Sequence, residues 1–197
     1  MTNIANLVSV GRVGLALITA SLLWSSHDSM HWLAFALTVL VIYSDALDGY
    51  LARKLKQATK FGGKLDIACD RAVEMIYWIA FAILNWIPVW IAFLFLIRGN
   101  FVDVIRAQAS EVGLTAFGET SMQKNVVGRF LVASNFSRFT YAVVKAVAFC
   151  LLIAAHTSYF APSIVPQIAS FFVYLSVIFC LIRALPVFFE GQELINK

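Results

Sequence analysis

Long apolar runs separated by polar connections constrain this chain more than any other feature. Six such runs lie at about residues 5–24, 32–52, 66–86, 88–110, 138–156 and 167–189. Each is close to the roughly 20 residues that an α-helix needs to cross a bilayer core. The mean hydropathy of +0.83 exceeds what a water-soluble domain of 197 residues requires. The sequence therefore predicts an all-α integral membrane protein with six transmembrane helices, forming a single domain over residues 1–197.

Basic residues are concentrated in alternate connections between these runs. The connections at 25–31, 86–89 and 156–167 contain no lysine or arginine. The basic residues in or beside the other connections are Lys54, Lys56, Lys60, Lys64, Arg106, Lys124, Arg129 and Arg138. The positive-inside rule then predicts that both termini are cytoplasmic. Because topology accounts for the net charge of +4, no nucleic-acid partner is expected.

The remaining reactive side chains indicate no second site. Cys69, Cys150 and Cys180 lie far apart in apolar segments, so they are expected to be buried free thiols. The predicted topology puts all three histidines on the outer side of the membrane.

The N-terminus has no basic region followed by a cleavage site, so no removable signal peptide is expected.

Four aspartates interrupt the apolar pattern between residues 45 and 70. Asp45 and Asp48 are three residues apart, and Asp66 and Asp70 are four apart, so each pair shares one helix face. If the two helices face each other, the repelling carboxylates require a cation between them, and oxygen ligands favour magnesium, manganese or calcium. The alternative is that these aspartates are solvated interfacial residues that offset neighbouring lysines. A charged aspartate inside a bilayer costs about 2.5–3.5 kcal/mol, which argues for a functional role.

The same stretch carries the pattern D-x2-D-G-x2-A-R-x8-G-x3-D-x3-D. Its eight fixed positions are Asp45, Asp48, Gly49, Ala52, Arg53, Gly62, Asp66 and Asp70. The pattern resembles the signature of the CDP-alcohol phosphotransferases. The segment from Asn6 to Arg12 resembles the P-N-x-x-T-x-x-R opening of that family, although Ala5 replaces the proline and Ser9 replaces the threonine.

The resemblance implies that a phosphatidyl group passes from CDP-diacylglycerol to a small alcohol, with release of CMP. It implies that Asp45, Asp48 and Asp66 bind magnesium or manganese, with two ions in the site. It also implies that Asp70 is the general base and that its carboxylate can contact a metal as well. The residues that it places at the donor nucleotide are Asn6, Gly49, Ala52, Arg53, Thr59 and Gly62.

Two of these donor-site interpretations have alternatives in the residues themselves. Small residues such as Gly49 and Gly62 let a nucleotide approach the backbone, but they also allow close packing of membrane helices. Arg53 suits an oxygen of a diphosphate, but it could also be a helix-end arginine whose head group reaches the membrane surface.

The acceptor is predicted from scattered arginines. Arg98 and Arg106 resemble the I-R-E…L-R segment of phosphatidylglycerophosphate synthases, with Gly99 in place of the glutamate. Arg138 and Arg183 resemble the anion pocket of phosphatidylinositol-phosphate synthases. We therefore expect Arg106, Arg138 and Arg183 to bind a phosphorylated acceptor. Glycerol 3-phosphate is the first candidate, with inositol phosphate or serine as alternatives. Each arginine could instead be a flanking charge that only sets topology.

The resemblance also implies a homodimer, which would be surrounded by membrane lipid. The predicted topology places the active site on the cytoplasmic side of the cytoplasmic (inner) membrane, because Asp48 and Asp66 flank a cytoplasmic connection. Two other classes remain open at this point. An ion-coupled transporter could use intramembrane carboxylates, but the chain lacks the internal repeats and midplane charges typical of that class. A metal-binding assembly protein without turnover is the other alternative.

Overall fold

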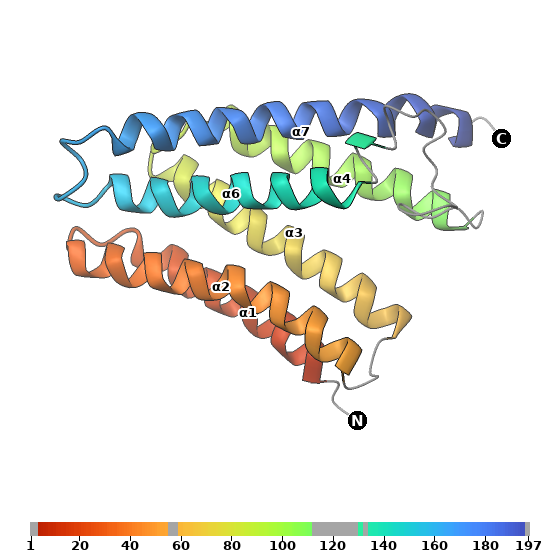
Figure 1. The fold of residues 1–197 in the computed structure, drawn as a ribbon, viewed down its shortest axis with the longest axis horizontal. Coiled ribbons are helices and arrows are strands. Elements are labelled where there is room, and N and C mark those ends of the chain that lie inside the picture. The colour runs from red at the N-terminus through yellow and green to blue at the C-terminus, as the bar shows by residue number, and fades with distance from the viewer. Residues whose placement is uncertain (1–3, 55–58, 112–129, 132–133, 196–197) are drawn as a thin grey trace. The chain divides into compact units, whose positions relative to one another are not determined.

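The computed structural model describes residues 4–54, 59–111, 130–131 and 134–195. Within these ranges the chain is all-helical and contains no strand. Its six helices (Figure 1) are α1 (Ile4–Leu22), α2 (Asp28–Lys54), α3 (Lys60–Ile83), α4 (Val89–Glu111), α6 (Asn135–Ala155) and α7 (Val165–Ile195). Six helices are predicted, and the described ranges contain six α-helices.

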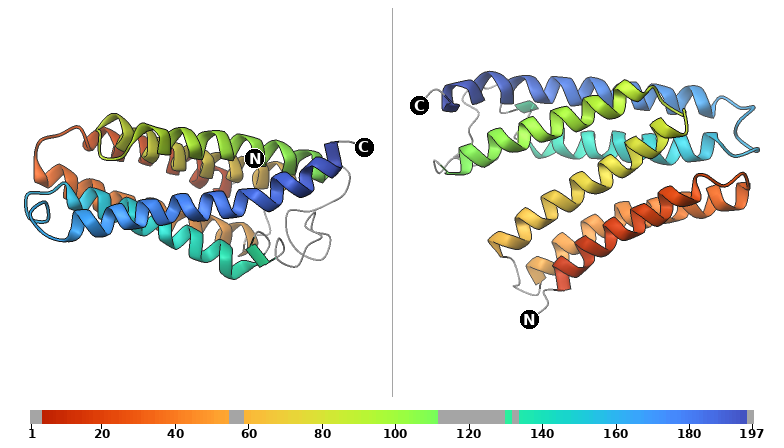
Figure 2. Two further views of the ribbon diagram at one scale, coloured as in Figure 1. Left: turned by 90° about the horizontal axis from the view of Figure 1, so that it is seen from above. Right: turned by 180° about the vertical axis from the view of Figure 1, so that it is seen from behind.

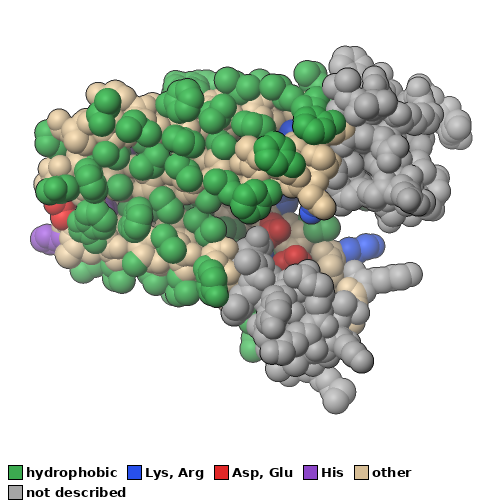
Figure 3. All heavy atoms as spheres, viewed as in Figure 1, with side chains coloured by type: hydrophobic (Ala, Val, Ile, Leu, Met, Phe, Trp, Pro, Cys, Tyr) green, Lys and Arg blue, Asp and Glu red, His purple; other side chains and the backbone are tan. Residues whose placement is uncertain are grey.

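Two of the helices are long and apolar enough to cross a membrane, at Asn135–Ala155 and Val165–Phe188. Asn6–Leu22 and Asp28–Ser44 are shorter apolar segments. Large apolar side chains are exposed along the helices, and Figure 3 shows them crowding the face that it draws. Such an apolar exterior suits contact with lipid. The six-span count and the cytoplasmic termini stay predictions.

The chain divides into two compact units. The first comprises Met1–Ala92 and Phe149–Ala169, and the second comprises Phe93–Ala148 and Ser170–Lys197. In the first unit α1 packs against both α2 and α3. The views in Figures 1 and 2 agree that α1 and α2 run side by side. As a result, the two helices that carry the aspartate motif share α1 as a neighbour.

An aromatic cluster forms the core of the first unit. The rings of Tyr77, Trp78 and Phe81 on α3 lie 4.9, 4.9 and 5.7 Å from the ring of Phe149 on α6. All three α3 side chains are almost completely buried. The Tyr77 hydroxyl also donates a hydrogen bond of 3.1 Å to Oγ1 of Thr38 on α2. This packing fixes the rotation of α3 about its axis and so determines which of its residues face α1.

Local sequence signals set both ends of α3. Thr59 is the N-cap, and its hydroxyl accepts a 2.9 Å hydrogen bond from the Gly62 amide. The helix therefore begins at Lys60, earlier than the predicted 66. It ends where Asn85 adopts a φ of 59°, and the Trp86 amide donates to the Phe81 carbonyl at 2.9 Å. The rings of Trp86 and Phe81 stack at 5.6 Å, which completes a Schellman-type termination.

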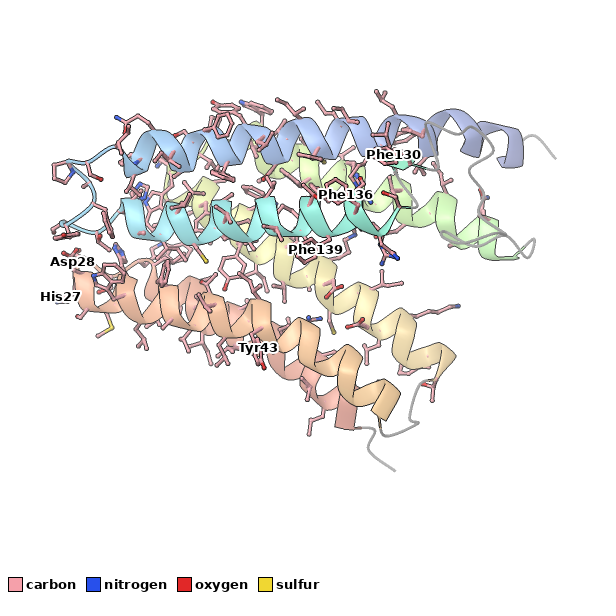
Figure 4. All side chains as sticks on the ribbon, viewed as in Figure 1. His27, Asp28, Tyr43, Phe130, Phe136 and Phe139 are labelled. Carbon is pink, nitrogen blue, oxygen red and sulfur yellow. The ribbon has the colours of Figure 1, made fainter. Side chains whose placement is uncertain are left out.

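Within the first unit, the start of α2 is joined to the loop that follows α6, at the end of α2 away from the motif. The Asp28 carboxylate accepts hydrogen bonds of 3.1 and 3.0 Å from the Ser158 amide. His31 Nδ1 lies 3.0 Å from the carbonyl oxygen of His156. Figure 4 labels His27 and Asp28 at the start of α2. Because these contacts hold His31 and His156 at this end, neither histidine belongs to the aspartate site.

The second unit has a small core of its own. Val102, Ile105 and Ala109 of α4 pack with Val187 of α7, and Leu131 and Phe188 cover them. Cys69, Cys150 and Cys180, which are distributed over the two units, form no disulfide, as predicted; Cys69 and Cys180 are buried, whereas Cys150 is only partly buried.

Candidate active site

Asp66 and Asp70 lie one helical turn apart on α3, and both contact Arg12 of α1. The Nη2 atom of Arg12 donates to Oδ1 of Asp66 at 3.3 Å and to Oδ1 of Asp70 at 2.5 Å. The Ser9 hydroxyl, one turn before Arg12, donates to the same Asp66 oxygen at 3.5 Å. The prediction that Asp66 and Asp70 share one face of a helix is therefore confirmed.

Burial is distributed unevenly over this group. The Arg12 side chain is only 2% exposed, whereas the Asp66 and Asp70 side chains are 41% and 50% exposed. The cation is therefore buried beneath two carboxylates that solvent can reach. Carboxylate oxygens in this setting can accept a metal ion or a substrate proton, because they are both charged and accessible.

The other motif helix is described only through its backbone at this point. α2 carries Asp45 and Asp48 near its C-terminal end, nine and six residues before its last residue, Lys54. The side chains of Asp45, Asp48, Ala52 and Arg53 and the surroundings of Gly49 lie outside the described part of the structure. Among the side chains that are described, no group of three or more His, Cys, Asp or Glu could hold a metal ion. The four-carboxylate cluster stays a prediction.

Three predicted donor-site residues come together at the start of α3. A Cβ atom placed on Gly62 would lie 2.9 Å from Oδ1 of Asn6 and 3.0 Å from Oγ1 of Thr59. Asn6 belongs to α1, so this contact joins the N-terminal segment to the motif. A larger side chain at position 62 would therefore displace the side chain of Asn6. The contact leaves both interpretations of Gly62 open, since close packing and access for a nucleotide both need a small residue.

The arginines predicted for the acceptor belong to the second unit. Arg183 of α7 is buried, and its Nη1 atom donates to the Leu131 carbonyl at 2.8 Å and to Oγ of Ser137 at 2.5 Å. Arg138 at the start of α6 is exposed. Arg98, which is buried, and Arg138 both lie close enough to act electrostatically on Arg183. The side chain of Arg106 lies outside the described residues. A group of arginines with two buried members can bind an anion.

Sequence reasoning missed the partner of the aspartates. The N-terminal pattern includes Arg12, but the sequence predicts no role for it. A signal is present in the sequence: Asn6, Ser9 and Arg12 recur every three residues as polar positions in the otherwise apolar first half of α1. Glu74 was also missed. It lies one turn beyond Asp70, is buried, and pairs with Arg71 at 3.1 Å.

Known proteins resemble this chain over most of its length. The family model described as CDP-alcohol phosphatidyltransferase matches residues 2–182. A CDP-diacylglycerol–glycerol-3-phosphate 3-phosphatidyltransferase of Pseudomonas fluorescens is 29% identical over 162 residues, which are 76% of this chain and 82% of that protein.

Shorter matches extend to enzymes with a different acceptor in their names. A phosphatidylinositol phosphate synthase of Mycobacterium marinum is 32% identical over 80 residues, which are 38% of this chain and 34% of that protein. A CDP-diacylglycerol–inositol 3-phosphatidyltransferase of Schizosaccharomyces pombe is 42% identical over 71 residues, 34% of this chain and 27% of that protein. Because the family model covers nearly the whole chain, and the aspartate pattern occurs within the match, this protein belongs to the CDP-alcohol phosphatidyltransferase family.

Proposed function

We propose that this enzyme transfers a phosphatidyl group from CDP-diacylglycerol to glycerol 3-phosphate and releases CMP, in phospholipid biosynthesis. The observation that carries the proposal is the pair of half-exposed carboxylates, Asp66 and Asp70, within the family's motif. Family membership favours an enzyme over the ion-coupled transporter and the assembly protein. The longest of the three matches, to the Pseudomonas protein, favours glycerol 3-phosphate as acceptor.

Divalent cations, magnesium or manganese and two in number, are proposed to bind Asp45, Asp48, Asp66 and Asp70. The described residues fit such a site, because Asp66 and Asp70 present charged, solvent-accessible oxygen atoms on one helix face. When bound, divalent cations neutralise the charge on the donor diphosphate, which allows an oxygen nucleophile to approach.

Asp70 is proposed as the general base. The acceptor hydroxyl gives its proton to the Asp70 carboxylate while its oxygen forms a bond to the phosphorus that carries diacylglycerol. The bond from that phosphorus to the bridging oxygen breaks, and the electron pair leaves with CMP. Asp70 suits this role because it is the more exposed carboxylate of the described pair, so that a hydroxyl can come within hydrogen-bond distance.

The donor nucleotide is proposed to bind along Asn6, Gly49, Ala52, Arg53, Thr59 and Gly62. Support comes from the contact between Asn6 and Gly62, because it brings the N-terminal segment to the small residue at the start of α3. Arg53 would pair with a diphosphate oxygen.

The acceptor phosphate is proposed to bind Arg106, Arg138 and Arg183. The burial of Arg183 and its bonds to Ser137 and Leu131 support this role, because a fixed guanidinium binds phosphate with less loss of entropy. Inositol phosphate is a second candidate acceptor, favoured by the match to the Mycobacterium marinum synthase.

The enzyme is proposed to act as a homodimer in the cytoplasmic membrane, with six spans, cytoplasmic termini and the site on the cytoplasmic side. The apolar exterior of the helices and the two long apolar helices support the membrane setting.

The test is a CMP-release assay on the purified full chain with CDP-diacylglycerol and a panel of alcohols. We expect release with glycerol 3-phosphate, loss of release in chelator, and recovery when magnesium or manganese is restored. Inositol phosphate or serine as the preferred acceptor would change the substrate but keep the reaction. Unchanged CMP release in chelator would contradict the metal site, and no release with any alcohol would contradict the proposed reaction.

A further inference from the structure

One nitrogen of Arg12 serves both carboxylates of α3. Its Nη2 atom contacts Oδ1 of Asp66 and Oδ1 of Asp70, on residues that are 54 and 58 positions away in the sequence. The guanidinium therefore already occupies the place of a positive charge between two proposed metal ligands.

Arg12 cannot lose its charge to adapt to a metal ion. A guanidinium stays protonated at any physiological pH, and this one is 2% exposed, so water screens it little. The ion pairs with Asp66 and Asp70 neutralise this buried charge. A divalent cation that binds the same two carboxylates must therefore share them with a buried positive charge.

We infer that Arg12 is an internal counter-cation that competes with the divalent ion for Asp66 and Asp70 and thereby lowers the affinity of the site for metal. This inference rests on the proposed function, because it takes both aspartates as metal ligands. Arg12 is a positioning residue in this role: it holds the two carboxylates together when no metal is bound, and it keeps metal binding weak and exchangeable.

Two opposing effects of Arg12 can be compared. Its contacts order the two aspartate side chains, which favours metal binding, but short side chains have little rotamer entropy to lose. Its charge repels a divalent ion from a distance of a few ångströms. Even with full screening by water, repulsion at that range lowers affinity about tenfold or more. Repulsion is therefore the larger effect, and removal of the charge should strengthen metal binding.

The test is calorimetric titration of the metal-free, detergent-solubilised full chain with Mn²⁺ alone. We expect Arg12→Gln to bind Mn²⁺ about tenfold or more tightly than wild type, while Arg12→Lys, which keeps the charge, stays near wild type. Thermal unfolding should show a lower Tm for metal-free Arg12→Gln and a larger rise in its Tm when Mn²⁺ is added, because the metal restores the missing counter-charge.

Two further variants are matched controls. Ser9→Ala removes a neutral hydrogen bond to the same Asp66 oxygen, and Lys64→Gln removes an exposed positive charge two residues before Asp66. Both should leave the affinity for Mn²⁺ within about threefold of wild type, because neither changes a buried charge at the carboxylates. An equal gain in Lys64→Gln would contradict a local role for Arg12.

The outcomes separate this inference from the proposed function. If wild type binds Mn²⁺ and Arg12→Gln binds no more tightly, the inference is wrong while the metal site stands. If neither protein binds Mn²⁺, the metal site itself is wrong. If Arg12→Gln does not fold, side-chain ¹⁵N spectra of the wild-type protein test whether Arg12 responds to the metal. The Arg12 signal is the one that disappears in the spectrum of Arg12→Lys. The Arg12 signal should shift as Mg²⁺ saturates the site, and an unchanged signal would overturn the inference.

Discussion

Gly62 lies directly against Asn6: a Cβ atom on Gly62 would be 2.9 Å from the Asn6 Oδ1 atom. The two residues come from different helices, and the contact joins the N-terminal segment of α1 to the start of α3. Since the atom that would be struck is the end of a side chain, Asn6 can move aside at modest cost in stability. Its position at the proposed donor site would then be lost.

We therefore expect Gly62→Ala to weaken activity more than stability. Apparent KM for CDP-diacylglycerol should rise several-fold, while the free energy of unfolding changes by no more than about 1 kcal/mol. Gly63→Ala is the matched control, because nothing lies within 4 Å of a Cβ atom at that position. Steady-state kinetics beside thermal unfolding make the comparison. Equal kinetics for the two variants would remove the proposed role of the Asn6–Gly62 contact.

Asparagine variants can distinguish the proposed roles of Asp66 and Asp70. Asp70→Asn keeps the shape of the side chain but cannot act as a base, so kcat should fall about 10²–10⁴-fold while binding of metal and CDP-lipid persists. Asp66→Asn should instead weaken metal binding, and excess metal should partly restore its rate. Calorimetry and steady-state rates are the measurements. If Asp70→Asn loses metal binding as severely as Asp66→Asn, Asp70 is mainly a ligand.

The acceptor arginines should differ in their effect on stability. Arg138 is exposed, so Arg138→Ala should raise the KM for a phosphorylated acceptor about 10–100-fold, the value of a charged hydrogen bond, with little change in Tm. Arg183→Ala should raise the same KM and also cost about 1–3 kcal/mol, because Ser137 and Leu131 lose a buried partner. Kinetics with both substrates and thermal unfolding test this. An equal rise in KM for CDP-diacylglycerol would leave these arginines as topology charges.

The end of α3 depends on Asn85, whose φ of 59° is unfavourable for side chains branched at Cβ. Asn85→Val should destabilise the fold by about 1–2 kcal/mol, whereas Asn85→Gly should be neutral or slightly stabilising. Thermal unfolding of both variants checks this, with the exposed helical residue Asn100 changed to alanine as control. A stable Asn85→Val variant would show that packing of Trp86 on Phe81 ends the helix unaided.

Stability should depend on pH through His156, whose ring stacks on Trp86 at 3.8 Å. Burial lowers the pKa of His156 below its ordinary value of 6.5, and nearby His31 lowers it further, whereas a hydrogen bond with the Leu152 carbonyl partly offsets both. The unfolded chain then binds more protons, so this contribution is complete above about pH 6.5 and declines as the pH falls below it. His156→Phe keeps the stacking and should flatten the dependence of Tm on pH. A profile identical to wild type would show that another group titrates.

The sequence alone determined the motif and the six helices of the described residues, because both depend on local patterns. Apolar runs near 20 residues predicted all six helices, and the observed ends lie within six residues of the predicted ones. The largest differences have local causes, such as the Thr59 cap, which starts α3 at Lys60. The spacing of Asp66 and Asp70 placed both on one face, since helical periodicity follows from the backbone.

Only the tertiary structure decided which residues contact the face of α3 that carries Asp66 and Asp70. Arg12 lies against Asp66 and Asp70, and Asn6 lies against Gly62, although more than 50 residues separate each pair. Such contacts depend on how α1 and α3 cross and rotate, which the aromatic packing of Tyr77, Trp78 and Phe81 on Phe149 helps to set. A pattern within one helix carries no information on that rotation, because many distant side chains determine it together. For this reason the sequence revealed the carboxylates, and the fold revealed their buried counter-charge.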